Sequence, residues 1–203
     1  MAYLIGIAGG SGAGKTTLAH ALSVALDNAP VVPMDAYYRD LGYLDAAARG
    51  RCNFDTPEAF DWPPFAADIR ALHRGDEIHR SRYDFVTHTR CHNPEIVVPK
   101  TYVIVEGRLV LHDAEIRTLL DTTVYVEADA ATALHRRVTR DQHERGRRAS
   151  DVRAQFSRYV QPMHERYVQP TARWATLRVT GTDRLDLSVQ RVVAHLDAPL
   201  DQV

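Results

Sequence analysis

A glycine-rich run near the N-terminus has the residue types and spacing of a polyphosphate-binding loop. The run that matches G-x-x-x-x-G-K-[ST] comprises Gly9, Gly10, Ser11, Gly12, Ala13, Gly14, Lys15 and Thr16, and Thr17 follows it. Glycines let successive backbone N–H groups point at phosphate oxygens, while Lys15 reaches the β- and γ-phosphates and the Thr16 hydroxyl ligates Mg²⁺. The run therefore predicts an ATP-magnesium site and leaves the subsequent chemistry open.

Two acidic residues each follow a short apolar run. Asp35 comes after residues 31–34, and Glu106 comes after residues 101–105. Ligands of open α/β sheets bind at the carboxyl ends of strands. There Asp35 could accept the proton of an acceptor hydroxyl or help to hold Mg²⁺, and Glu106 could bind the metal directly or through water. On sequence alone, an ordinary turn aspartate and an ordinary strand-end glutamate remain equally open.

Arginines gather between residues 136 and 148, where the chain contains Arg136, Arg137, Arg140, Arg145, Arg147 and Arg148. Such a run is often a solvated helix face. The alternative is a lid, at about 136–150, whose arginines stabilise charge on the γ-phosphoryl group and whose closure excludes water. Because a P-loop kinase must keep water from its phosphoryl donor, Lys15 favours the lid.

Short apolar runs alternate with helical patterns along the chain, at residues 3–8, 31–34, 101–105, 123–126 and 177–179. This alternation predicts an α/β fold: a three-layer P-loop NTPase sandwich with a mostly parallel five-stranded sheet. No linker divides the chain, so we expect one kinase domain over residues 1–203.

Residues 39–99 break this alternation, with most of the prolines, many aromatics and a single clear helix, Pro63 to His73, for which Asp61 is the expected cap. A long aromatic-rich insertion in a compact domain is typical of substrate binding, so we predict that it binds the acceptor. His88 stands out within Tyr83 to His88, where an aromatic, an acid and an imidazole come together. The alternative for this segment is a weak strand with polar alternation.

The bulk composition limits the classes of partner. The 203 residues have a formal net charge of -1, so no global positive field favours nucleic acid or an anionic membrane. The two cysteines, Cys52 and Cys91, lack the spacing of a zinc site or a disulfide framework. The apolar start, Met1 to Ala8, is too short for a spanning helix and lacks a basic lead. We therefore expect a cytoplasmic protein with a small-molecule substrate.

Taken together, these segments resemble the uridine-cytidine kinase family. The matching stretches, in the family's order, are 9–17, 35–38, 53–61, 83–90, 105–107, 136–147 and 155–170. The most specific are Asn53-Phe54-Asp55-Thr56-Pro57 and Tyr83-Asp84-Phe85-Val86-Thr87-His88. The resemblance implies phosphorylation of the 5′-hydroxyl of uridine or cytidine to UMP or CMP, a pyrimidine salvage reaction, with ATP or GTP as donor. It also implies that the chain can form a homo-oligomer, often a tetramer.

The resemblance also assigns roles to individual positions. Asp35 matches the general base, with Thr16 and Glu106 as the magnesium site to which Asp35 could add, and Arg140 and Arg145 match lid arginines that face ATP phosphates. Asp55 would hold the ribose hydroxyls, and Tyr83 and His88 would meet the base. The full set that matches nucleoside-binding positions is Tyr38, Phe54, Asp55, Tyr83, His88, Arg137, Arg147 and Gln155.

Three departures from the family pattern carry expectations of their own. Asp-Ser-Phe-Tyr becomes Asp35-Ala36-Tyr37-Tyr38, which keeps the acid and the last tyrosine. Arg108 replaces an apolar residue after Glu-Gly and is expected to add a charge near the metal. Pro-Arg-Gly is reduced to Val179-Thr180-Gly181, which leaves the role of that segment toward adenine open.

Two other functions remain compatible with the sequence. One is a phosphoribulokinase-like enzyme, for which Arg39, Arg49 and Arg51 could bind a sugar phosphate, although the aromatic residues around Tyr83 favour a base. The other is a nucleotide-dependent binding module with no small acceptor. A GTPase switch is disfavoured because the guanine-reading string Asn-Lys-x-Asp does not occur in the sequence.

Overall fold

The computed structural model describes residues 1–91 and 93–197. Its central sheet has the strand order β2-β7-β1-β8-β9, and every pair of neighbours is parallel. The strands are β1 (Tyr3–Gly9), β2 (Val31–Pro33), β7 (Tyr102–Glu106), β8 (Thr122–Glu127) and β9 (Leu177–Thr180). Each predicted apolar run becomes a strand, and the predicted five-stranded sheet is confirmed.

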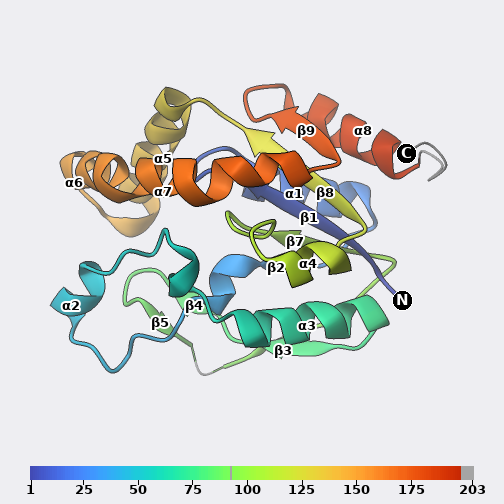
Figure 1. The fold of residues 1–203 in the computed structure, drawn as a ribbon, viewed down its shortest axis with the longest axis horizontal. Helices are drawn as coiled ribbons and strands as arrows, with labels where there is room; N and C mark the ends of the chain where they lie inside the picture. The colour runs from blue at the N-terminus through green and yellow to red at the C-terminus, as the bar shows by residue number, and fades with distance from the viewer. Residues whose placement is uncertain (92, 198–203) are drawn as a thin grey trace.

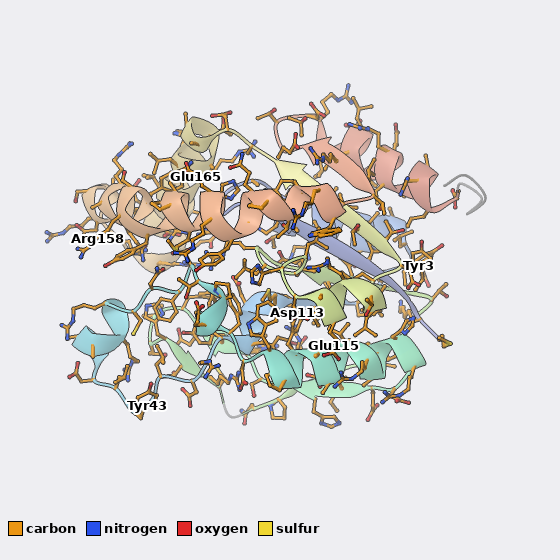
Figure 2. All side chains as sticks on the ribbon, viewed as in Figure 1. Tyr3, Tyr43, Asp113, Glu115, Arg158 and Glu165 are labelled. Atoms are coloured by element: carbon orange, nitrogen blue, oxygen red, sulfur yellow. The ribbon has the colours of Figure 1, made fainter. Side chains whose placement is uncertain are left out.

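Helices cover both faces of this sheet (Figure 1). Ile5 and Ile7 of β1 pack in one buried cluster with residues of α1 (Lys15–Ala25) and α8 (Leu185–Leu196). Leu4 points to the other face, in a cluster with residues of α3 (Trp62–Arg74) and α4 (Ala114–Leu119). Glu115 of α4, labelled in Figure 2, pairs with Arg70 of α3, and this ion pair joins the two helices. The alternation along β1 therefore produces the predicted three layers.

The insertion contains more regular structure than the sequence predicts. Besides α3 it forms α2 (Ala46–Gly50), a 3₁₀ turn (η2, Pro57–Ala59) and two antiparallel pairs, β3 (Ile78–Arg80) with β6 (Glu95–Val97) and β4 (Tyr83–Asp84) with β5 (Thr89–Arg90). These elements are too short to leave a clear periodicity. Asp61 occupies the predicted N-cap position of α3, but its side chain makes no cap hydrogen bond and instead accepts from Arg90 Nη2 at 3.2 Å.

The predicted lid is largely helical. It begins within α5 (Ala130–Arg145), turns at Gly146 and continues into α6 (Ala149–Gln155). Helical turns then follow almost without a break through η3 (Phe156–Val160), α7 (Gln161–Met163), η4 (His164–Val168) and η5 (Gln169–Trp174). In Figure 1, α5 and α6 lie at the same end of the molecule as α2 and the β4–β5 pair. There the Arg145 guanidinium lies 4.5 Å from the centre of the Phe85 ring.

Within the described residues, no helix is long and apolar enough to cross a membrane. Cys52 and Cys91 are both free thiols.

Candidate active site

The glycine-rich run forms a tight loop between β1 and α1. Gly14 has φ 106° and occupies the N-cap position of α1, where it has no side chain to cap the helix. Gly12 also has positive φ, and a Cβ there would lie 2.4 Å from the carbonyl oxygen of Ala133. Both positions therefore require glycine. The loop leaves the N-terminal end of α1, with its positive dipole, directed at the place where phosphates would bind.

Lys15 lies almost completely buried in this loop, with 8% of its surface exposed. Its Nζ donates to the carbonyl oxygen of Gly10 at 2.9 Å. Burial lowers the pKa of Lys15, while the negative charges of Glu106 and Asp35 act in the opposite direction. The ammonium group is therefore held close to two carboxylates in a poorly solvated position that a bound polyphosphate would stabilise.

Asp35 and Glu106 meet at the carboxyl edge of the sheet. Pro33 of β2 is in register with Glu106 of β7, and Asp35 follows in a 3₁₀ turn (η1, Met34–Tyr37). The Thr16 hydroxyl donates to Glu106 Oε1 at 3.2 Å. Burial raises the pKa of Glu106, with Asp35 adding to the effect and Lys15 opposing it. The predicted strand-end placement of both acids is thus found.

The oxygen atoms of this cluster suit a hard divalent cation. Thr16, Glu106 and Asp35 present one hydroxyl and two carboxylates, which are the ligand types that Mg²⁺ takes from proteins. Among the described residues, Asp35 Oδ1 is buried without a hydrogen-bond partner. Since such an atom is costly to leave unpaired, it fits a site completed by a metal ion or a substrate hydroxyl.

An aromatic wall faces this cluster from the insertion. The Tyr38 ring lies 5.7 Å from that of Phe54 and 5.0 Å from that of Tyr83, and the His88 ring stacks on Phe54 at 4.4 Å. Tyr83 Oη and His88 Nδ1 are buried without partners in the described part of the chain. Burial lowers the pKa of His88, helped by Arg145 and Arg147, so its imidazole is neutral at pH 7. Flat rings with unpaired polar atoms suit a planar heterocycle.

Asp55 lies beside this wall and pairs with Arg108, a contact that the sequence did not predict. Arg108 Nη1 contacts Asp55 Oδ1, while Nη2 contacts the Tyr38 hydroxyl and donates to the carbonyl oxygen of Phe54 at 3.0 Å. All of these polar contacts lie in the acceptor wall. The Arg108 charge also acts on Lys15, and that of Asp35 acts on Arg108, so the expected added charge near the metal stays a prediction. Gly107 explains this direction: a Cβ there would lie 2.5 Å from Met34 Cβ, so the chain turns tightly after Glu106.

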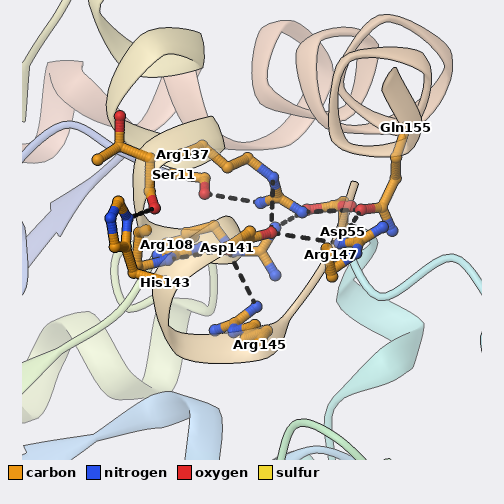
Figure 3. A network of polar contacts seen from close by, with 11 residues as sticks. Ser11, Asp55, Arg108, Arg137, Asp141, His143, Arg145, Arg147 and Gln155 are labelled. Atoms are coloured by element: carbon orange, nitrogen blue, oxygen red, sulfur yellow. Dashed lines mark hydrogen bonds and ion pairs between the residues drawn. The ribbon is translucent and has the colours of Figure 1, made fainter. Parts of the chain in front are cut away.

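The lid arginines converge on one buried carboxylate, Asp141 (Figure 3). Asp141 is 0% exposed, and Arg140 donates to its Oδ1 through Nε at 3.0 Å and through Nη2 at 2.8 Å. Three further arginines lie between 3.2 and 3.8 Å from it, namely Arg137, Arg145 and Arg147. Burial acts to raise the pKa of Asp141, but the arginines outweigh it and hold that pKa below its usual value.

Arg137 connects this cluster to the phosphate loop. Its Nη1 donates to Ser11 Oγ at 2.8 Å and its Nη2 to Gln155 Oε1 at 3.0 Å, where Arg147 also donates at 2.8 Å. Burial lowers the pKa of Arg137 to about 10, so it stays charged at neutral pH. Arg137, Arg147 and Gln155 are thus brought together between the lid and the loop, and their predicted contact with a nucleoside stays a prediction. So does the predicted contact of Arg140 and Arg145 with ATP phosphates.

A cavity of about 350 Å³ opens beside the phosphate loop. Its wall includes Thr17, Arg136 and Val179 to Gly181, with Asp183, Leu185 and Ser188. Arg136 donates to the carbonyl oxygen of Gly181 at 2.9 Å. A Cβ at Gly181 would lie 1.9 Å from the carbonyl oxygen of Ala13, so Gly181 packs directly against the phosphate loop. The reduced Val179-Thr180-Gly181 segment therefore lines this cavity, and its role toward adenine stays open. The sequence analysis missed the other lining residues because no motif marks them.

Comparison with known proteins agrees with this geometry. The sequence profile of the Phosphoribulokinase / Uridine kinase family matches residues 4–188. This chain belongs to that family. Its relatives include the uridine kinase of Deinococcus deserti, 41% identical over 85% of this chain and 84% of the relative, and that of Lactobacillus helveticus, 37% identical over 98% and 96%. The predicted family and the predicted kinase class are thereby confirmed.

A solved structure supports the fold. That of a candidate fructose transport system kinase from Silicibacter matches with a TM-score of 0.67 and 25% identity, over 88% of this chain and 89% of the other. The chain is therefore a nucleotide-binding P-loop kinase, an enzyme of the phosphotransferase class.

Proposed function

We propose that this kinase transfers the γ-phosphoryl group of ATP to the 5′-hydroxyl of uridine or cytidine. The observation that carries the proposal is the position of Asp35. It lies in the turn η1, which follows β2 beside Glu106 on the phosphate side and leads directly into Tyr38, whose ring lies 5.0 Å from that of Tyr83 on the acceptor side. A carboxylate between a phosphate loop and an aromatic wall is where a general base for a nucleoside hydroxyl is needed.

In this mechanism Asp35 accepts the proton of the 5′-hydroxyl as that oxygen forms a bond to the γ-phosphorus. The bond from the γ-phosphorus to the bridging oxygen breaks, and ADP leaves. Lys15 and the lid arginines stabilise the negative charge on the transferring group, and the lid keeps water from competing with the nucleoside. Thr16, Glu106 and Asp35 would hold Mg²⁺, which neutralises phosphate charge when bound.

The acceptor wall supports a nucleoside over a sugar phosphate. A second phosphate would need uncommitted basic side chains in the insertion. Arg39 Nε donates to the carbonyl oxygen of Phe60, and Arg49 Nη1 donates to that of Leu44. These two arginines therefore hold the insertion's own backbone. Arg51 is exposed and its side chain makes no hydrogen bond or ion pair with the described residues, so the preference for a nucleoside rests on the stacked His88 and Phe54 rings, which offer a surface for a pyrimidine.

The names of the relatives agree with this substrate, because both of those quoted are called uridine kinases. Acceptor-dependent ADP release tests the proposal, using uridine, cytidine, purine nucleosides and ribulose 5-phosphate, with ATP or GTP as donor. We expect turnover with the pyrimidine nucleosides and at most a small fraction of it with the others. Turnover with ribulose 5-phosphate alone, or ATP hydrolysis that no acceptor stimulates, would refute it.

A further inference from the structure

Arg108 is a largely buried cation that the proposed reaction does not use. Its side chain is 12% exposed and that of its partner Asp55 is 6% exposed, so the ion pair is shielded from water. The residues that follow it, Leu109 to Leu111, are also buried. A guanidinium amid such neighbours is stable only if its charge and its donors are matched, and Asp55, Tyr38 and Phe54 match them.

The pair changes what Asp55 requires from an acceptor. A buried carboxylate without a partner is costly, so it would depend on the hydroxyls of a bound sugar. Here Arg108 already supplies the opposite charge at Oδ1. A sugar that lacks one hydroxyl would therefore leave Asp55 still paired, and the loss of affinity would be small.

Arg108 also determines that the Tyr38 hydroxyl can act toward an acceptor as a hydrogen-bond donor. Because the phenol oxygen accepts from Arg108 Nη2, its own proton is free to be donated elsewhere. Burial raises the pKa of Tyr38, which keeps that proton in place. The wall therefore offers an acceptor the Tyr38 hydroxyl as a donor, beside the hydroxyl of Tyr83, which is unpartnered among the described residues, and a carboxylate whose charge is already balanced.

The neutral charge of the Arg108–Asp55 pair also indicates which kind of acceptor fits beside it. Arg108 is matched one-to-one by Asp55, so this part of the wall has no surplus positive charge to attract an anionic group. An uncharged hydroxylated molecule fits it better than a phosphorylated or carboxylated one.

We propose that Arg108 is a specificity-determining residue that makes the kinase tolerant of acceptors lacking one sugar hydroxyl, so that 2′-deoxyribonucleosides are substrates beside ribonucleosides. This inference rests on the proposed phosphorylation of pyrimidine nucleosides and on the predicted contact of Asp55 with the sugar hydroxyls. It concerns the sugar, while the proposed function concerns the base and the 5′-hydroxyl.

The test compares kcat/KM for uridine, 2′-deoxyuridine and 3′-deoxyuridine in the unmodified enzyme, Arg108→Met and Arg108→Lys. We expect the unmodified enzyme to prefer uridine by less than about tenfold. Arg108→Met leaves Asp55 dependent on the sugar, so this preference should rise by about tenfold or more, mainly through KM of the deoxynucleosides. Arg108→Lys keeps the charge but cannot reach all three partners, and its preference should fall between the two.

Arg80→Leu is the matched control, because Arg80 is also a buried arginine, 10% exposed and 3.0 Å from Glu95, but lies in the β3–β6 pair. It should leave the ribose preference unchanged. If Arg108→Met does not fold, Arg108→Lys alone must still shift the ratio. The inference is overturned if the unmodified enzyme prefers uridine over the deoxynucleosides by far more than about tenfold, or if neither Arg108 variant changes this ratio of kcat/KM values. In either case, turnover of uridine leaves the proposed function intact. Absence of uridine turnover refutes the proposed function itself.

Discussion

At the scale of single residues, Asp35 is the side chain on which the proposed chemistry depends most directly. Replacing it with Asn keeps the shape but removes the group that accepts the hydroxyl proton. We expect Asp35→Asn to lower kcat by about 10²–10⁴-fold, the usual contribution of a general base, with little change in KM for uridine. Steady-state kinetics would measure this effect. Asp27→Asn is the control, since the Asp27 side chain is 98% exposed and lies 3.9 Å from Lys100 Nζ.

Residual turnover within about tenfold of the unmodified enzyme would contradict the role of Asp35 as a base. Binding of a non-hydrolysable ATP analogue, measured by calorimetry in the absence of Mg²⁺, should persist in Asp35→Asn. Loss of that binding would instead assign Asp35 to the nucleotide site.

Individual residues also differ in how far the sequence could predict them. Lys15 and Thr16 belong to a local motif, and Glu106 follows an apolar run, so their placement depends on neighbours in the chain. The Arg108–Asp55 pair joins positions 53 residues apart. No pattern in the sequence connects them, because the pairing arises only when the turn at Gly107 directs the chain toward the insertion.

At the scale of elements, Asp141 organises the lid. It brings four arginines close to one another, and without its charge they would repel. We expect Asp141→Asn to lower kcat/KM for ATP by about 10–100-fold, corresponding to about 1.4–2.7 kcal/mol, and to make the lid more open to protease. Kinetics at varied ATP, with limited trypsin digestion between α5 and α6, would measure both effects.

The control for this prediction is Asp76→Asn, since Asp76 pairs with Arg74 at 2.9 Å on an exposed surface. Exposed pairs contribute at most about 1 kcal/mol, so neither ATP kinetics nor digestion should change. Unaltered trypsin sensitivity and kinetics in Asp141→Asn would show that the arginines hold their positions without it.

The lid illustrates which contacts the spacing of a helix can predict. Arg137 and Arg145 stand four residues on either side of Asp141, so they share a face of α5 with it. Arg147 reaches the same carboxylate because Gly146, with φ 61°, ends the helix and turns the chain back. The charge run alone allowed a solvated face, which the burial of Asp141 argues against, while the closing of this segment as a lid stays a prediction.

At the scale of the whole molecule, the fold buries two groups of opposite charge in the site, the Glu106 carboxylate and the Lys15 ammonium group. Burial raises the pKa of Glu106 and lowers that of Lys15, so the fold disfavours the charged form of each. The contribution of Glu106 to stability is fully present below its ordinary pKa and is lost as pH rises through the raised one. That of Lys15 is fully present above its ordinary pKa and is lost as pH falls through the lowered one. The nucleotide-free protein therefore gains from neither group between these pKa values.

Glu106→Gln should accordingly stabilise the nucleotide-free protein at pH 7 while impairing catalysis. Glutamine resembles the protonated acid, so a gain of about 1 kcal/mol would raise Tm by about 2–4 °C in a chain of this size. Scanning calorimetry should show that the gain shrinks as pH falls, because Glu106 of the unmodified protein then becomes protonated. The stabilisation by Mg²⁺ and ATP together should weaken in the same variant.

Glu127→Gln is the matched control, because Glu127 is also the last residue of a strand, β8, which β1 separates from β7 in the sheet. Its side chain is about half exposed and pairs with Arg178 at 3.6 Å. Its Tm should change little, since exposed pairs contribute little to stability. A lower Tm in Glu106→Gln at pH 7 would mean that the Lys15–Glu106 attraction outweighs burial. The Lys15–Glu106 pair would then stabilise the nucleotide-free protein. The binding of Mg²⁺ and ATP would correspondingly offset a smaller cost of burying these two charges.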